Sequence, residues 1–223
     1  SFNGSRYIEE QLDSIYKQNY SCWKLFVSDD GSTDDTLLIL KRYQSAWGIS
    51  KLEILEGPAK GFQSNFMSLI TNNNIDADYY ALCDQDDVWL PSKLINSINL
   101  LQKQNTKKPV LYCSRTQYVD VNLKGIGYSN IIKKSPSLGN ALMQCLAGGN
   151  TMVFNNSLKK INIKFSSAPI VSHDWWLYLT CELFDGHTIY DEKPSILYRQ
   201  HPQSLVGSNT SFGAKLNRLM KML

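Results

Sequence analysis

Three carboxylates follow directly on an apolar run near the middle of the chain. The run at 79–83 reads YYALC, and Asp84, Asp86 and Asp87 come immediately after it. A short apolar run that ends in polar residues predicts a buried strand, and acids at the carboxyl end of such a strand lie where open α/β sheets bind ligands. Two carboxylates one residue apart also form an oxygen-rich site of the kind that Mg²⁺ or Mn²⁺ prefers. The alternative interpretation is a solvated acidic loop.

Two further acidic positions stand at the ends of predicted elements. Asp29 and Asp30 follow the apolar run KLFVS, and Asp174 opens a predicted helix in the sequence HDWW. A carboxylate at the start of a helix can simply be a cap. Two adjacent tryptophans, Trp175 and Trp176, cannot both face the core of that helix. We therefore expect one of them to line a cleft, where aromatic rings stack on sugars or bases, with core and interface packing as the alternative.

The elements that must position these side chains alternate regularly in the first half of the chain. We expect strands at 24–28, 51–55, 79–83 and 110–115, and helices at 6–17, 34–43, 91–104 and from residue 61 onwards. Such alternation predicts a parallel sheet with helices on both faces. After residue 115 the pattern loosens, with short helices at 140–146 and 174–184, short strands at 151–154, 187–190 and 195–198, and a closing helix at 212–223. We expect one domain over 1–223, with a nucleotide-binding half (1–115), an irregular second half (116–207) and a basic amphipathic helix within 208–223.

The composition is that of an ordinary globular domain. The chain has 223 residues, 43% of them apolar and 19% charged, and a net charge of +3 that favours no particular partner, nucleic acid included. No acid follows Glu192, so the last 31 residues carry +5 and the rest −2. Five widely spaced cysteines without a C-x-x-C pair predict reduced thiols in a reducing compartment. No apolar run is long enough for a transmembrane helix.

Six segments, in their order and spacing, resemble a known enzyme family. SFNGSRYIEEQLDSI, VSDDGSTDDT and CDQDDVW look like family 2 glycosyltransferases with the GT-A fold, and LAGGNTMVF, HDWW and YRQHPQSLVG are similar to acceptor-side motifs of its bacterial rhamnosyltransferase-like branch. The resemblance covers nearly the whole chain. It implies an α/β fold with a mostly parallel sheet flanked by helices and an irregular acceptor-side second half. The family begins with a strand that leads into the residue matched by Ser1, so we expect the first strand to be missing from this sequence.

The resemblance also implies the reaction and the roles of matched residues. The implied activity is an inverting, metal-dependent transfer of a sugar from a nucleoside-diphosphate sugar to a glycan or lipid-linked glycan, in bacterial surface polysaccharide synthesis. The matched positions are Ser1, Asn3, Asp29, Asp30, Asp84 and Gln85 at the donor, Asp86 and His201 at the Mg²⁺ or Mn²⁺ ion, Asp174 as the general base, and Gly148, Gly149, Trp175 and Trp176 at the acceptor. For His201 a polar loop histidine is the alternative. The branch favours a deoxythymidine diphosphate-rhamnose donor, with galactose or N-acetylhexosamine on uridine diphosphate left open.

These residue types suit the implied chemistry. The leaving diphosphate develops negative charge, which a divalent cation stabilises, and the acceptor hydroxyl needs a positioned base. Two other interpretations stay open: a sugar-nucleotide or glycan-binding module without turnover, and a haloacid-dehalogenase-type phosphatase, whose D-x-D-x-[TV] pattern CDQDDVW also fits. A receiver domain would explain Asp29 and Asp30 but leaves HDWW unexplained.

The acid-free end of the chain is consistent with two interpretations, packing on protein and contact with a membrane. The predicted helix 212–223 carries its leucines and Met220 on one stripe, with its cations largely off it. A basic amphipathic helix can lie on an anionic membrane surface. We therefore expect a cytoplasmic protein whose helix packs on the domain itself or on residues beyond Leu223, or, alternatively, makes peripheral contact with the inner face of the cell membrane.

Overall fold

The computed structural model describes residues 1–201, and the helix expected at 212–223 lies outside them. Within the described residues the helices are α1 (Ile8–Tyr16), α2 (Thr36–Trp47), α3 (Phe62–Ile70), α4 (Lys93–Leu101), α5 (Leu138–Ala141), α6 (Asn156–Lys164) and α7 (His173–Leu183), with a 3₁₀ turn, η1, at Gly149–Thr151. The strands are β1 (Leu25–Asp29), β2 (Leu52–Glu56), β3 (Tyr79–Ala81), β4 (Val88–Trp89), β5 (Val110–Ser114), β6 (Gln117–Val119), β7 (Gly125–Tyr128), β8 (Val153–Asn155), β9 (His187–Asp191) and β10 (Ile196–Arg199).

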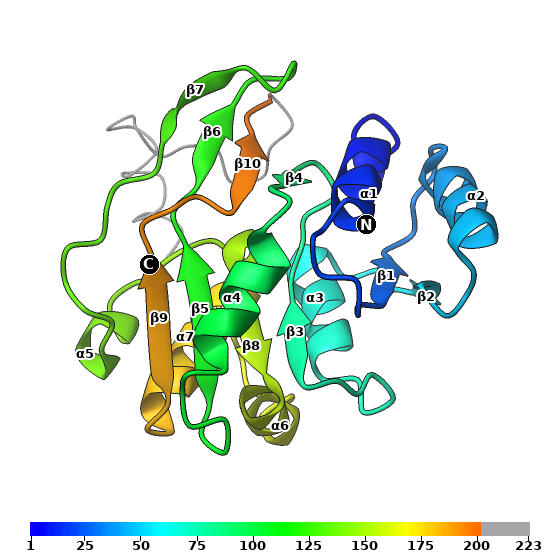
Figure 1. Cartoon of the computed structure of the whole chain (residues 1–223). Helices are drawn as coiled ribbons and strands as arrows, with labels where there is room; N and C mark the ends of the chain where they lie inside the picture. The colour runs from blue at the N-terminus through cyan, green and yellow to red at the C-terminus, as the bar shows by residue number, and fades with distance from the viewer. Residues whose placement is uncertain (202–223) are drawn as a thin grey trace.

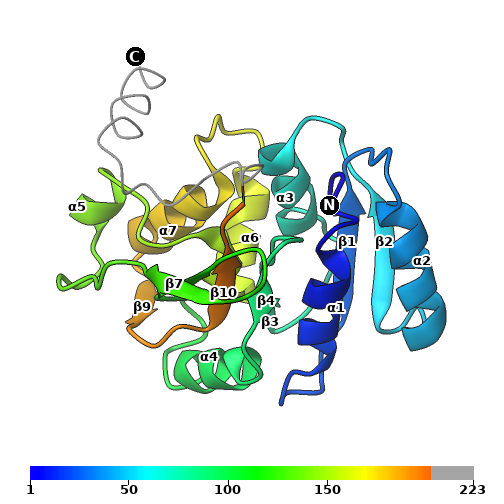
Figure 2. The same ribbon diagram turned by 90° about the horizontal axis from the view of Figure 1, so that it is seen from above.

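A four-stranded sheet of order β3-β8-β5-β9 forms the centre of the molecule. Helix α4 covers one face of it, and α6 and α7 cover the other (Figures 1 and 2). Because side chains alternate between the faces of a strand, Tyr112 of β5 packs with Leu101 of α4 while its neighbour Leu111 packs with Leu177 of α7. Both faces are therefore buried, as a sheet between two helical layers requires.

The parallel pair β1–β2 lies to one side of this sheet, next to α1 and α2, which also contact each other (Figures 1 and 2). The apolar spacing of α1 places Ile8 and Leu12 on one face, and these side chains pack with Leu40 of α2. Helix α3 contacts β1 as well. This packing fixes the carboxyl end of β1, where Asp29 and Asp30 stand.

A second four-stranded sheet, of order β4-β10-β6-β7, lies beyond the carboxyl end of β5 (Figure 1). β10 is its junction, since it pairs antiparallel with β4 and parallel with β6. β4 directly follows the carboxylate cluster at 84–87, and β10 directly precedes Gln200 and His201. The sheet therefore brings these two distant parts of the sequence together.

The predicted α/β class with flanking helices is confirmed, and one detail of it is corrected. Among the described strands three pairings are parallel and four are antiparallel, so the sheets are mixed and not mostly parallel. The main reason is β8, which lies antiparallel between β3 and β5. The helix α6 and the strands β4, β6 and β7 were not predicted. No helix within residues 1–201 is long and apolar enough to cross a membrane.

Candidate active site

Most of the first five residues are hydrogen-bonded to the end of β1 and the segment that follows it. Ser1 donates its hydroxyl to Asp29 Oδ1 at 2.8 Å, and the same oxygen accepts from Ser32 Oγ at 2.6 Å. Asn3 has a left-handed backbone (φ 45°), and its side-chain oxygen accepts from Thr33 N at 2.8 Å. Burial alone would raise the pKa of Asp29, but the hydrogen bonds from Ser32 and Ser1 lower it. This carboxylate is thus ionised and occupied in shaping the loop.

Asp30 holds a second loop in place. It is buried, and its two carboxylate oxygens accept from the amides of Ala59 and Gly61, both at 2.7 Å. Its own amide donates to Ser1 O at 2.8 Å. Asp30 therefore joins the first residues of the chain to the loop that precedes α3, and these segments surround one end of β1.

Gln85 and Asp84 reach the same N-terminal segment from β3. The Gln85 amide group pairs with the backbone of Phe2 in both directions, each bond 2.8 Å long. A Cβ on Gly4 would lie 2.5 Å from the Gln85 amide group, so any side chain there would push Gln85 out of this position. Burial and the negative charges of Asp86 and Asp174 raise the pKa of Asp84 to about 7. Carboxylates from β3 and from the start of α7 thus influence one another directly.

Asp86 is paired with His201. The distance from His201 Nε2 to Asp86 Oδ2 is 2.8 Å, and the Tyr7 ring lies against the imidazole with centroids 5.0 Å apart. No group of three or more His, Cys, Asp and Glu side chains within residues 1–201 is arranged as a complete metal site. Mg²⁺ usually takes only one or two protein carboxylates and completes its shell with substrate phosphates and water. Asp86 and His201, beside the mutually repelling carboxylates Asp84 and Asp174, fit an ion of that kind.

Asp174 lies in the first turn of α7 against a tight turn of the chain. Its Oδ1 accepts from the amide of Trp175 at 2.8 Å, which orients the carboxylate. A Cβ on Gly149 would lie 3.3 Å from Asp174 Cβ and 2.5 Å from His173 Nε2. At Gly148 it would meet Asn150 Oδ1 at 2.8 Å. The two glycines therefore permit close packing, and neither has a positive φ.

The two tryptophans line a pocket next to Asp174. Trp175 donates its indole N–H to Ala141 O at 2.6 Å, and both rings are half-buried. With apolar side chains from α5, α7 and the preceding loop they enclose a pocket of about 160 Å³, lined by Ala141, Leu142, Pro169, Val171, Trp175, Trp176 and Leu179. The expected cleft beside the tryptophans is present, and it is apolar.

Sequence reasoning missed the buried polar residues behind these side chains. Asp87 and Arg199 are both 0% exposed, and Asn150 and Lys93 are buried as well. Asp87 was recognised as an acid and Arg199 stands in the quoted segment YRQH, but neither was given a role. His173, whose ring stacks on Phe66 at 4.2 Å, was also missed. The sequence offered one signal for such residues, namely a charged residue at the end of an apolar segment, and this signal does not show which partner the residue meets.

The five cysteines are all free thiols, as expected, although Cys22 is exposed. Cys113 and Cys181 are buried, and burial raises the pKa of both thiols, that of Cys181 to about 12. They act as small apolar core residues.

Comparison with solved structures identifies the fold. TarS 1–349 from S. aureus in complex with UDP-GlcNAc aligns with a TM-score of 0.68 at 16% identity, over 100% of this chain and 63% of that one. The mannosyltransferase PcManGT from Pyrobaculum calidifontis, in complex with GDP-Man and Mn2+, aligns at 0.65 and 16% identity, over 92% of this chain and 56% of that one. The expected GT-A fold is thus confirmed, and this chain spans about three fifths of those proteins.

Sequence comparison agrees. The dTDP-rhamnosyl transferase RfbG of Shigella flexneri is 34% identical over 98% of this chain and 77% of its own length. The UDP-Glc:alpha-D-GlcNAc-diphosphoundecaprenol beta-1,3-glucosyltransferase WfgD of Escherichia coli is 25% identical over 81% of this chain and 66% of its own. The model of the family described as Glycosyl transferase family 2 matches residues 1–178. The chain therefore belongs to glycosyl transferase family 2.

Proposed function

We propose that this chain is the catalytic domain of an inverting, metal-dependent glycosyltransferase that moves rhamnose from a nucleoside-diphosphate sugar to a glycan acceptor. One observation carries the proposal. Asp84, Asp86 and Asp174 come from two distant parts of the sequence, yet burial, together with the negative charges of Asp86 and Asp174, raises the pKa of Asp84 to about 7. Repulsion makes a group of ionised carboxylates unfavourable unless a cation or a proton neutralises part of the charge. Transfer from a diphosphate sugar involves both a metal cation and a proton taken from the acceptor.

The reaction assigns a separate task to each side of the site. Asp174 accepts the proton of the acceptor hydroxyl as that oxygen forms its bond to the anomeric carbon. The bond from this carbon to the diphosphate oxygen breaks at the same time, and its electron pair leaves with the diphosphate. When bound at Asp86 and His201, Mg²⁺ or Mn²⁺ stabilises the developing negative charge. Attack from the face opposite the leaving group inverts the anomeric centre.

The donor assignment is supported by the residues around β1 and by the relatives. The proposed donor-binding residues are Ser1, Asn3, Asp29, Asp30, Asp84 and Gln85. Hydrogen bonds of all of these except Asp84 hold the loops of the 1–115 half around one end of β1. The rhamnosyl transferase RfbG is named for a dTDP donor, which favours thymine as the base. PcManGT, solved with Mn2+, favours a divalent ion.

The acceptor assignment rests on the second half of the chain. Gly149 packs against the start of α7, and Gly148 precedes it in the same turn. Trp175 and Trp176 line the apolar pocket next to the proposed base. WfgD is named for a diphosphoundecaprenol-linked substrate. We therefore propose a lipid-linked glycan acceptor in surface polysaccharide synthesis, used by a cytoplasmic enzyme at the inner face of the membrane.

A binding screen followed by a transfer assay tests this function. Thermal unfolding is measured with dTDP, UDP and GDP, each with and without Mn²⁺; a nucleotide at 100 times its Kd stabilises the fold by about 2.7 kcal/mol. We expect dTDP with Mn²⁺ to give the largest shift. Sugar transfer to a lipid-linked glycan from the cognate donor must then follow. Nucleotide binding without transfer would indicate a binding module, and phosphate release from simple phosphoesters would indicate a phosphatase.

A further inference from the structure

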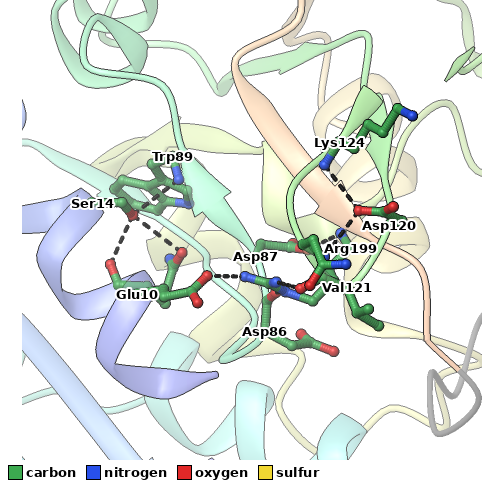
Figure 3. A network of polar contacts seen from close by, with 11 residues as sticks. Glu10, Ser14, Asp86, Asp87, Trp89, Asp120, Val121, Lys124 and Arg199 are labelled. Carbon is green, nitrogen blue, oxygen red and sulfur yellow. Dashed lines mark hydrogen bonds and ion pairs between the residues drawn. The ribbon is translucent and has the colours of Figure 1, made fainter. Parts of the chain in front are cut away.

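A fully buried arginine joins three segments of the chain directly behind Asp86. Arg199, at the end of β10, is 0% exposed, and its guanidinium lies 4.5 Å over the Tyr7 ring. Nε donates to Asp86 O at 3.0 Å, Nη1 donates to Val121 O at 2.6 Å, and Nη2 forms an ion pair with Glu10 (Figure 3). The planar guanidinium of Arg199 thus links the backbone of Asp86, the proposed metal ligand, to α1 and to the β6–β7 hairpin.

The hydrogen bond to Asp86 is made at the main chain. Arg199 holds the carbonyl oxygen, while the Asp86 carboxylate turns to His201 at 2.8 Å. The guanidinium therefore fixes where Asp86 stands without taking its carboxylate. A buried cation is expensive to desolvate and is retained only where several partners satisfy it. The position of Arg199, with a partner for each of its nitrogens, meets that condition.

Asp87 continues the connection to the acceptor side. It is 0% exposed, its Oδ1 accepts from Arg199 N at 3.3 Å, and its Oδ2 accepts from Asn150 Nδ2 at 2.5 Å. Lys93 Nζ in turn donates to the carbonyl oxygens of Asn150 (3.0 Å) and Thr151 (3.1 Å). This turn also contains Gly149, against which the start of α7 packs. A continuous set of buried hydrogen bonds therefore runs from Arg199 to the turn beside Asp174.

We infer that Arg199 and Asp87 are positioning residues. They hold Asp86, the proposed metal ligand, at a fixed distance from the turn that contains Gly149, which lies beside the proposed base Asp174. The inference rests on the proposed function, since it needs Asp86 at the ion and Asp174 at the acceptor. In-line displacement requires the attacking oxygen, the anomeric carbon and the leaving oxygen to be aligned, and small errors in such alignment are expensive. Neither residue touches a substrate in this scheme. Both act through the groups that they hold.

The first test separates positioning from stability. Arg199→Lys keeps the charge but lacks the planar fork that places a separate nitrogen at each of the three segments. We expect the affinity for Mn²⁺ in the presence of the nucleoside diphosphate, measured by calorimetry without turnover, to fall about 10- to 100-fold, as is typical when a residue supporting a metal ligand is changed. Lys159→Met is the matched control, because Lys159 is also buried (2% exposed) and bonds the carbonyl oxygens of Asn72 and Ile75, away from the site.

The second test uses exchange of two partners. Asp87→Asn places an amide against the Asn150 amide, and adding Asn150→Asp restores the hydrogen bond with its polarity reversed. We expect kcat to fall about 10²-fold in the single variant and to recover at least tenfold in the double variant, with the donor KM little changed in both.

The outcomes are distinct. If Arg199→Lys binds Mn²⁺ as the wild type does, or if Lys159→Met with an equal loss of thermal stability weakens Mn²⁺ binding equally, Arg199 has only a structural role. If the double variant recovers stability but no kcat, Asp87 does not position the turn. If the wild-type protein binds no Mn²⁺ with any nucleoside diphosphate, the proposed function itself is wrong.

Discussion

Gly149→Ala adds one methyl group at the point where the acceptor turn meets the start of α7. The new Cβ would lie 2.5 Å from His173 Nε2, whereas ordinary contact begins at 3.4 Å, so one side must move by about 0.9 Å. His173 has little room to move, because it is 6% exposed and its ring stacks on Phe66 at 4.2 Å. The overlap is therefore passed to the backbone at the start of α7, where Asp174 follows His173.

The magnitude has two parts. Overpacking of this size costs about 1 to 3 kcal/mol of stability, which in a domain of this length lowers the unfolding temperature by about 2 to 12 °C. A displacement of about 1 Å at a reacting group costs about 10² in rate. We therefore expect kcat for sugar transfer to fall about 10²-fold at a temperature where the variant is fully folded, while the affinity for the nucleoside diphosphate stays within twofold.

The assay needs a second glycine for comparison. Gly139→Ala is the control, since a Cβ there meets nothing within 4 Å, and it should leave the rate unchanged and not lower the stability. Calorimetric binding of the nucleotide and single-turnover transfer are measured on the same preparations. A folded Gly149→Ala variant that transfers sugar within twofold of the wild-type rate would refute the claim that this turn sets the position of Asp174.

Three further changes probe other parts of the site. Asp86→Ala should abolish metal-dependent transfer and weaken Mn²⁺ binding; undiminished activity that still requires metal, in a transfer assay, would place the ion elsewhere. Burial alone would raise the pKa of Asp34, but hydrogen bonds from Thr36 and Ser5 lower it from 3.8 to about 2. Because the folded-state pKa is the lower one, this stabilisation is present above about pH 4 and is lost as the pH falls towards 2. Asp34→Asn should therefore cost about 1 kcal/mol at pH 7, after allowance for solvent screening, and less at pH 3; urea unfolding that gives the same difference at both pH values would contradict this. Trp175→Phe removes the hydrogen bond to α5 and should raise the acceptor KM in steady-state kinetics with the donor KM unchanged. An equal rise in both KM values would show that the indole does not belong to the acceptor site.

The first half of the fold could be predicted because its elements carry their own signals. The spacing of Ile8, Leu12 and Ile15 predicted α1, and all three side chains are buried. The apolar run before Asp84 predicted β3 at nearly its observed position. In these segments periodicity and burial agree, so a local pattern is sufficient.

The second half could not be predicted in the same way. β4 and β6 are two and three residues long and exist through their pairing with β10, which no local pattern reveals. Helix α6 is rich in lysine, and its N-cap Asn155 is also the last residue of β8. Lys159 is buried there because its ammonium group bonds backbone carbonyl oxygens. Tertiary contacts outweigh composition in these elements.

The candidate site likewise contains residues that could be predicted from the sequence and residues that could not. Residues that carry a family motif, such as Asp86 and Asp174, could be named from the sequence, and the charges of both act on Asp84. Arg199 and Asp87 are different, because their importance lies in partners more than 60 residues away along the chain. A charged residue at a strand end gives no sign of which distant carbonyl or amide it will meet.

The reaction at Asp174 is the central claim, and Asp174→Asn tests it most directly. The substitution keeps the size and the hydrogen bond from Trp175 N but removes the ability to accept a proton. The rate of sugar transfer is measured in a single turnover with the nucleoside-diphosphate sugar and Mn²⁺ saturating, and donor affinity is measured in parallel by calorimetry. We predict a rate lower by about 10² to 10⁴ with donor affinity unchanged. An undiminished rate, or a loss of donor binding equal to the loss of rate, would contradict the assignment of Asp174 as the base.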